Sequence, residues 1–243
     1  MIVVYDGSFE GFLSLVYEVY YKKIKPTSIL RETPKRLVLE ELHESFYDEG
    51  NSLKVFTALK EKFSKQNFET ILNTFMCDSI EFEMPLLEYI ILGFKNQSEL
   101  QNINNGSVFS VLGFTKQLFS NVHKMTGFLR FVELEDGSLY AKLESRFNLV
   151  YFLGRHFSKR FNNQTYYIHD INRSLVFVHS PEFKGVREIS AFELPTVSEN
   201  EKKFEKLWKT FFESVAIESR KNDKLQKNVV PLIYRTYMNE FMN

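Results

Sequence analysis

The stretch Gly127-Phe128-Leu129-Arg130-Phe131-Val132-Glu133-Leu134 runs into Glu135-Asp136-Gly137-Ser138 and then into Leu139-Tyr140-Ala141-Lys142-Leu143. In both outer runs, aromatic and aliphatic residues are mixed with charged ones in the manner of half-buried strands. The Asp-Gly pair between them is a strong short-range signal for the tight turn of a β-hairpin. The sequence therefore predicts a hairpin over residues 127–143.

The chain that follows this hairpin extends the same sheet. Residues 148–161 carry apolar side chains at helical spacing, which predicts a helix. Tyr166–Asp170 and Ser174–His179 flank a short turn and predict a second hairpin. The order strand-strand-helix-strand-strand favours an antiparallel sheet with a helix on one face. The expected fold class is α+β, with this β-β-α-β-β unit at its centre.

The first half of the chain has mainly helical periodicity. Ile2–Tyr5 predicts one short strand, Asp6-Gly7-Ser8 a turn, and the apolar spacing from Phe9 onward a helix. We expect residues 1–122 to form this strand and a mostly helical region. The expected helices between Pro34 and Val122 cover Leu37–Tyr47, Leu53–Lys65, Phe68–Met76, Met84–Phe94 and Val108–Val122.

Two further helices close the chain. Glu199–Glu218 has apolar residues three and four positions apart, and residues 225–241 predict a last helix. Pro231 lies within this last segment, and because proline lacks an N–H it must start or kink a helix. We expect both helices to pack back onto the sheet within a second region, residues 123–243, so that the chain forms one compact body with two lobes.

Composition restricts the class of protein. Apolar residues make up 44% of the 243 residues, enough for a large core, and the 31 basic and 31 acidic residues cancel, so long-range attraction of nucleic acid is excluded. The single cysteine, Cys77, excludes an internal disulfide and fits a reducing compartment. The N-terminus lacks the basic region of a signal peptide, and no apolar run is long enough to cross a bilayer. We expect a cytoplasmic protein that does not associate with membranes.

A local basic excess lies between Lys116 and Arg160, where eight basic residues stand against four acidic ones. Aromatic residues are interleaved with these charges, and rings beside cations can stack unpaired bases while the cations bind phosphate. The alternative interpretation is that the rings belong to the core and the charges to a solvated rim. The candidate nucleic-acid-binding residues here are Lys124, Arg130, Tyr140, Lys142, Arg155, Lys159 and Arg160.

A second basic segment connects the last two predicted helices. Arg220, Lys221 and Lys224 make it a candidate for binding an anion. The simpler interpretation is that these side chains complement the negative end of the preceding helix dipole, and that Asn222 or Asp223 caps the next helix.

Three stretches carry a family resemblance: Tyr5-Asp6-Gly7-Ser8-Phe9-Glu10-Gly11-Phe12-Leu13, the block from His123-Lys124-Met125-Thr126-Gly127 through His169-Asp170, and Ile217–Phe241. They resemble a family of bacterial DNA-metabolism proteins, usually encoded beside a radical S-adenosylmethionine (SAM) protein assigned to DNA modification or repair. Related domains occur fused to uracil-DNA-glycosylase-like domains of the X type. In the closing block Asp223 stands where the family has proline. The resemblance implies an accessory protein that binds DNA, the radical SAM partner, or both, and it carries over no catalytic residue.

Two alternatives remain open. One is an enzyme acting on a nucleobase or nucleotide, with His156 or His169 as the acid–base group and Asp170, Asp6 or Glu144 as the carboxylate. The other is a protein–protein adaptor anchored by exposed aromatic residues such as Trp208 or Tyr237. The sequence has no phosphate-binding glycine loop, no nucleophile elbow and no zinc-helix motif, so we expect neither a metal nor a cofactor.

Overall fold

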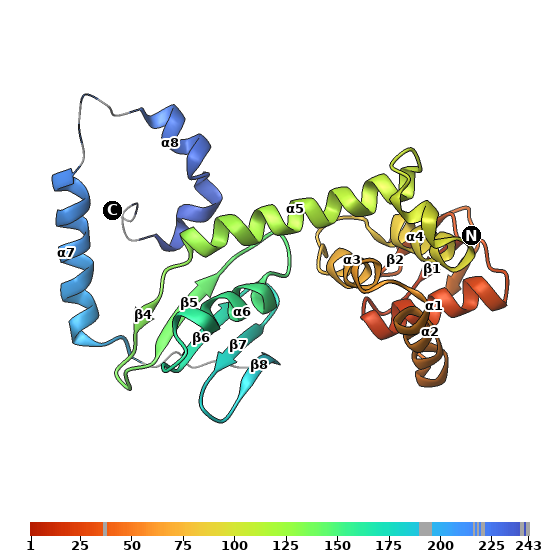
Figure 1. Cartoon of the computed structure of the whole chain (residues 1–243), viewed down its shortest axis with the longest axis horizontal. Coiled ribbons are helices and arrows are strands. Elements are labelled where there is room, and N and C mark those ends of the chain that lie inside the picture. The colour runs from red at the N-terminus through yellow and green to blue at the C-terminus, as the bar shows by residue number, and fades with distance from the viewer. Residues whose placement is uncertain are drawn as a thin grey trace. The chain divides into compact units, whose positions relative to one another are not determined.

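The computed structural model describes residues 1–35, 38–189, 196–215, 217, 219, 222–238 and 241. It divides into two compact units, unit 1 with residues 1–118 and unit 2 with residues 119–243 (Figure 1). This division and the predicted boundary after residue 122 both fall inside one long helix, α5 (Gly106–Phe128).

Unit 1 contains a three-stranded parallel sheet in the order β2-β1-β3. The central strand β1 (Ile2–Val4) is buried along its whole length, and it pairs with β2 (Ser28–Leu30) on one edge and β3 (Leu42–Glu44) on the other. In this register Val3 lies opposite both Ile29 and His43. A run of β-branched residues suits a strand that is covered on both faces, as the opening of the sequence predicts.

The helices of unit 1 surround a core that includes Phe12, Leu59 and Leu86. The Ser8 hydroxyl caps the first helix by accepting a hydrogen bond of 2.9 Å from the backbone N–H of Gly11. The predicted helices from residue 53 to residue 122 are confirmed, with ends shifted by a few residues. The helices are α1 (Phe9–Tyr21), α2 (Glu49–Lys62), α3 (Lys65–Phe75), α4 (Glu83–Lys95), the 3₁₀ helix η1 (Gln97–Gln101) and the first part of α5.

The helix predicted over Leu37–Tyr47 is wrong. Of that segment the structure describes residues 38–47, which contain strand β3 and no helix. The backbone N–H of Ile2 donates to the carbonyl of Glu41, and the N–H of Ser45 donates to the carbonyl of Val4. The apolar spacing of a segment this short fits either a helix or a strand. Hydrogen bonding to the open edge of β1 therefore decides the structure in favour of the strand.

Unit 2 contains a five-stranded sheet in the order β4-β5-β6-β7-β8. Both predicted hairpins are confirmed, and Gly137 occupies the left-handed conformation (φ +77°) that the first turn requires. A fifth strand, β8, was absent from the prediction because its sequence, Lys-Gly-Val-Arg-Glu, is polar and mostly exposed, as is common at a sheet edge. The strands are β4 (Val132–Glu133), β5 (Leu139–Leu143), β6 (Tyr166–Asp170), β7 (Leu175–His179) and β8 (Lys184–Glu188).

The prediction that this sheet is antiparallel throughout is wrong at one pair. Strands β5 and β6 run parallel, with Ala141 opposite Ile168, so the sheet is mixed. Helix α6 (Val150–Arg160) connects them and returns the chain to the edge where β5 began, as a crossover between neighbouring strands must. The overall α+β class is confirmed.

One face of the sheet in unit 2 is covered by α6. Gly154 on this helix lies against the ring of Phe177, and the carbonyl of Gly154 accepts a 2.7 Å hydrogen bond from the hydroxyl of Tyr166. Side chains alternate between the faces of a strand, so the register places Ala141 and Ile168 on this covered face. The residues that alternate with these along each strand, such as Tyr140 and His169, point to the opposite face.

Of the C-terminal elements that were expected to pack back onto the sheet, α7 and the last 3₁₀ helix contact the rest of unit 2, whereas residues 223–229 are exposed. Helix α7 (Glu199–Val215) lies beside β4 (Figure 1), and the Glu201 carboxylate accepts a 3.0 Å hydrogen bond from the backbone N–H of Glu133. Pro231 separates α8 (Asp223–Val229) from the 3₁₀ helix η3 (Leu232–Tyr237), so the predicted last helix is divided at its proline. The Tyr237 hydroxyl donates a hydrogen bond to Glu144, next to the end of β5.

Candidate nucleic-acid interface

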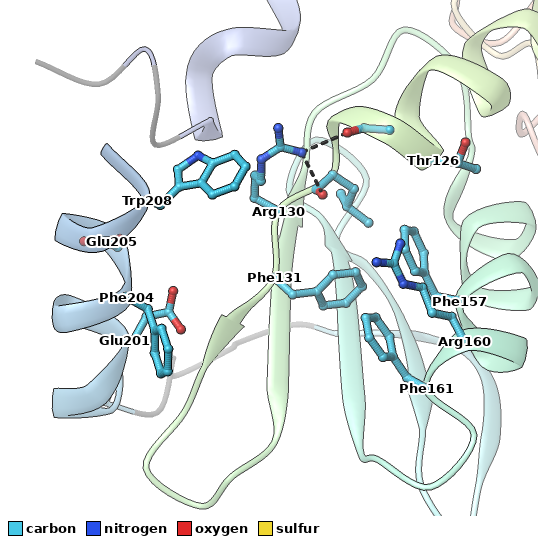
Figure 2. A pocket seen from close by; sticks show the side chains of 12 residues that line it. Thr126, Arg130, Phe131, Phe157, Arg160, Phe161, Glu201, Phe204, Glu205 and Trp208 are labelled. Atoms are coloured by element: carbon cyan, nitrogen blue, oxygen red, sulfur yellow. Dashed lines mark hydrogen bonds between the residues drawn. The ribbon is translucent and has the colours of Figure 1, made fainter. Parts of the chain in front are cut away.

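A pocket of about 460 Å³ lies between α6 and α7 in unit 2 (Figure 2). Its walls combine aromatic rings, two guanidinium groups and two carboxylates. The lining residues are Thr126, Gly127, Leu129, Arg130, Phe131, Phe157, Arg160, Phe161, Glu201, Phe204, Glu205 and Trp208.

Helix α7 forms one wall of the pocket through a single face. The four lining residues of this helix occupy positions i, i+3, i+4 and i+7, which brings their side chains to one side of it: Glu201, Phe204, Glu205 and Trp208. Phe204 and Trp208 are 61% and 43% exposed, so their rings are open to a ligand. This wall presents flat apolar surface and carboxylate oxygens together.

The opposite wall is a rigid aromatic cluster built on the segment before β4 and the end of α6. The ring of Phe131 packs edge-on against Phe157 and Phe161, with centroids 4.9 and 5.2 Å apart. Phe157 and Phe161 are themselves nearly parallel, at an interplanar angle of 9°. Figure 2 shows these rings across the pocket from Phe204 and Trp208. Because each ring is fixed by its neighbours, this wall keeps its shape without a ligand.

The two guanidinium groups reach the pocket from different elements. Arg130 Nη1 donates to the carbonyls of Gly127 and Leu129, at 2.8 and 3.4 Å, where α5 ends. Helix ends of this kind carry partial negative charge and hold cations favourably. Arg160, on the last turn of α6, is exposed and lies 5.7 Å from the ring centroid of Phe161. The pocket thus combines one anchored and one solvent-facing cation.

The structure brings Arg130 and Arg160 together and separates the other predicted nucleic-acid-binding residues from them. Arg155 and Lys159 lie on the exposed side of α6, with Arg155 Nη1 3.3 Å from the Tyr151 hydroxyl that accepts its hydrogen bond. Lys124 is exposed on α5, and Lys224 is exposed on α8. Arg220 and Lys221 lie outside the described residues.

Tyr140 and Lys142 lie on the face of the sheet opposite α6. Their β5 positions alternate with Ala141 and Leu143, which point toward the helix. Tyr140 is only 2% exposed, so its ring belongs to the packing of this face. The Lys142 ammonium lies 5.8 Å from the ring centroid of Tyr237, the residue that also donates to Glu144. The basic excess of the sequence is therefore divided between two faces of unit 2.

Of the residues of the enzyme alternative, His169 and Glu144 share the face of the sheet opposite α6, whereas His156 and Asp170 lie elsewhere. His156 is exposed on α6. Asp170 is fully buried at the end of β6, where its carboxylate accepts a 2.9 Å hydrogen bond from Arg173 Nη1. His169 is on the face opposite α6, and its Nδ1 shares a 2.8 Å hydrogen bond with the hydroxyl of Tyr140. Neither histidine nor Asp170 lines the pocket between α6 and α7.

Burial determines the ionisation of this histidine–tyrosine pair. Burial lowers the pKa of His169, and the ammonium of Lys142 lowers it further, although the Asp170 carboxylate acts in the opposite direction. Burial also raises the pKa of Tyr140 to about 12. Both groups are therefore held in their neutral forms around neutral pH. In this state neither group carries a charge whose burial would cost free energy, and the two can share a hydrogen bond.

The wall of the pocket that α7 forms carries no basic excess, but the apolar spacing of its sequence was a signal for it. Phe204 and Trp208 belong to the apolar spacing that predicted α7, yet both are exposed in the structure. An apolar stripe with two glutamates beside it is compatible with a helix that packs on a core and with one that faces a pocket. The fold of the chain distinguishes them, because α7 contacts the sheet mainly through β4.

These features define an α+β protein in which a mixed sheet carries an aromatic, arginine-containing pocket. The chain belongs to the family described as a domain of unknown function, DUF4130, whose model matches residues 81–240. Comparison with curated proteins and with solved structures gives no match.

Two observations on the described part of the chain complete the site. Within it, no helix combines the length and apolar character needed to cross a bilayer. Within the same residues, no three histidine, cysteine, aspartate or glutamate side chains are grouped so that they could hold a metal ion.

Proposed function

We propose that this protein is a DNA-metabolism accessory protein whose unit 2 binds single-stranded or extruded nucleotides in the pocket between α6 and α7. The observation that carries the proposal is the combination of Arg130 and Arg160 with the rings of Phe131 and Trp208 in one pocket. Guanidinium groups bind phosphate, and aromatic rings stack any base. The family resemblance supports the same class of ligand.

The two carboxylates favour a nucleotide over a simple anion. The Glu201 carboxylate is already engaged by the backbone of Glu133. Glu205, which is half-buried one turn further along the same helix face, can accept a hydrogen bond from the exocyclic amino group of a base. Adenine, cytosine and guanine carry such an amino group and thymine does not, so a strand of mixed sequence should bind more tightly than oligothymidylate.

The test compares Arg160→Ala with Lys159→Ala, adjacent exposed positions on α6 of which only Arg160 lines the pocket. Binding of a labelled single-stranded oligonucleotide is measured by anisotropy at several salt concentrations. Loss of one charge-assisted contact should weaken binding by Arg160→Ala about tenfold and make the slope of log K against log salt shallower by about 0.7. Lys159→Ala should bind as wild type.

Trp208 supplies an independent signal. It is the one tryptophan of the sequence, so the intrinsic indole fluorescence of the chain comes from the pocket. Stacking of a base should quench this fluorescence in parallel with the anisotropy change. Equal weakening by Lys159→Ala and Arg160→Ala, without quenching, would instead place the strand along the exposed side of α6 and refute the pocket assignment.

The radical SAM partner is the second element of this proposal. Leu207, Phe211 and Val215 on α7 are each more than half exposed and recur four residues apart, which makes an apolar stripe suited to a partner protein. Replacing Leu207 and Phe211 with serine should abolish co-elution with a radical SAM protein of the kind encoded beside family members. Unchanged co-elution would exclude this stripe as the contact.

An enzyme acting on a nucleobase is the alternative that one observation favours, namely the hydrogen bond between the neutral His169 and Tyr140. If this pair transfers protons, His169→Gln should abolish turnover of a nucleotide substrate while Arg160→Ala changes mainly its affinity. Absence of any product from wild-type protein and single-stranded DNA leaves the binding function.

A further inference from the structure

Unit 1 carries a second aromatic and basic site, on the surface formed by α1, α2 and α4. We infer that this groove binds a single strand of nucleic acid by stacking bases on tyrosine rings and holding phosphates with lysines, independently of the pocket in unit 2. The tyrosine–lysine groove is defined by Tyr17, Tyr20, Tyr21, Lys54, Lys62 and Phe94. Of these residues only Phe94 lies within the part of the chain matched by the family model.

The aromatic part of the groove is continuous and open. The rings of Tyr17 and Tyr21 lie with centroids 4.4 Å apart, Tyr20 and Tyr21 are 5.1 Å apart, and Tyr20 contacts Phe94 at 6.1 Å. Tyr20 and Tyr21 are 44% and 63% exposed, respectively. The groove encloses about 110 Å³, a shallow hollow beside rings that remain accessible. Flat rings in this arrangement offer successive stacking platforms.

The charged residues that line the groove have one sign. Lys54 Nζ lies 5.5 Å from the centroid of Tyr17, and Lys62 Nζ lies 5.9 Å from that of Phe94. The described residues that line the groove include no aspartate or glutamate. A ligand that carries anionic groups beside flat apolar rings complements this surface, and single-stranded nucleic acid has both at every residue.

A third lysine is held at the groove by a strained backbone. Lys23 follows the end of α1 with φ +60°, a left-handed conformation in which glycine is preferred, and its Nζ lies 5.5 Å from the centroid of Tyr20. Glycine, the usual residue in this conformation at a helix end, would remove both the backbone strain and the positive charge. A lysine retained there at a cost in stability indicates a use for its ammonium group.

The first experiment measures single-stranded oligothymidylate binding by the full chain in an Arg160→Ala background, so that binding at the pocket in unit 2 is already weakened. Replacing both Lys54 and Lys62 with alanine should make the salt slope of log K shallower by about 1.4, the value for two phosphate contacts. Replacing Tyr21 with alanine should weaken binding about tenfold. Lys60→Ala is the matched control, because Lys60 is an exposed lysine of α2 that does not line the groove.

Lys23→Gly separates function from folding. Relief of the left-handed strain should raise the thermal midpoint, while loss of the ammonium should weaken oligonucleotide binding. A residue that only supports the fold would not move these two quantities in opposite directions. Photocrosslinking of bound oligothymidylate should label Tyr20 or Tyr21 in the wild-type chain.

The outcomes separate the two sites. If the Lys54/Lys62 and Tyr21 variants bind as tightly as their Arg160→Ala parent, the groove is overturned, whether or not Arg160→Ala itself shows that the unit 2 pocket binds DNA. Weakening in the groove variants with no effect of Arg160→Ala supports the groove and overturns the pocket. Binding of a polyglutamate peptide at the groove, without binding of oligothymidylate, also overturns the inference, because the groove would then bind an acidic protein segment.

Discussion

Replacing Gly154 with alanine tests the packing that positions the pocket. A Cβ at this position would lie 2.2 Å from Cγ and Cδ2 of Phe177, whose side chain is 2% exposed and surrounded by core. Neither the ring nor the helix can yield freely, because the carbonyl of Gly154 also accepts hydrogen bonds from Ser158 and Tyr166. Overpacking costs about 1–3 kcal/mol, and separations of 2.2 Å place this site at the upper end, about 2–3 kcal/mol. The better helix propensity of alanine returns about 1 kcal/mol. The expected net loss is about 1–2 kcal/mol.

Urea unfolding followed by circular dichroism measures this loss, with Gly113→Ala as the control. Gly113 is also helical, in α5, but a Cβ there meets no atom within 4 Å, so alanine should stabilise by up to about 1 kcal/mol. The two identical substitutions should therefore have opposite signs. Phe177→Leu combined with Gly154→Ala should recover part of the loss. If Gly154→Ala is as stable as wild type, α6 is not held against the sheet by this contact.

Three further predictions concern other parts of the molecule. Glu83→Ala should lower the free energy of unfolding by about 3 kcal/mol, because the half-buried Arg31, whose Nε lies 2.6 Å from this buried carboxylate, loses its ionic partner. Glu83→Gln should lower the free energy of unfolding by less, and equal losses for the two variants would contradict an ionic contribution. Ser8→Ala should cost about 1 kcal/mol in denaturant unfolding because Gly11 loses the cap, whereas Ser8→Asp should retain it. Burial raises the pKa of Tyr237 to about 12 from an ordinary 10, so stability should fall as the pH rises from 10 toward 12, and a pH titration of unfolding should show a smaller fall for Tyr237→Phe.

The sequence predicted those parts of the fold that depend on neighbouring residues. The hairpin at Asp136-Gly137 was predictable because the turn chemistry lies within the turn itself, and the Gly137 conformation confirms it. The parallel pairing of β5 with β6 was not, since it depends on where α6 returns the chain. Strand β3 was missed for a related reason, because its pairing partner β1 lies about 40 residues earlier and pairing at a distance leaves no local pattern.

The candidate site divides in the same way. Local charge pointed to Arg130 and Arg160, and both line the pocket. The same charge count also included Lys142, which strand alternation turns to the opposite face of the sheet. The wall containing Trp208 comes from a helix that begins almost 40 residues after the end of α6, so no short window of sequence shows the arginines and the indole together. A count of charges identifies candidates, and the sheet register decides which of them share a surface.

The neutral charge of the chain determines how either site can work. Because the 31 basic and 31 acidic residues cancel, encounter with nucleic acid gains little from long-range attraction, and affinity has to come from contacts made after the ligand arrives. Such contacts are strongest where the groups are fixed beforehand, since less conformational entropy is then lost on binding. Arg130, held by the carbonyls at the end of α5, and the rings of Phe131 and Phe157, packed edge to face, meet that condition. If the proposed function holds, this preorganisation favours recognition of exposed bases at short range over a search of duplex DNA by charge.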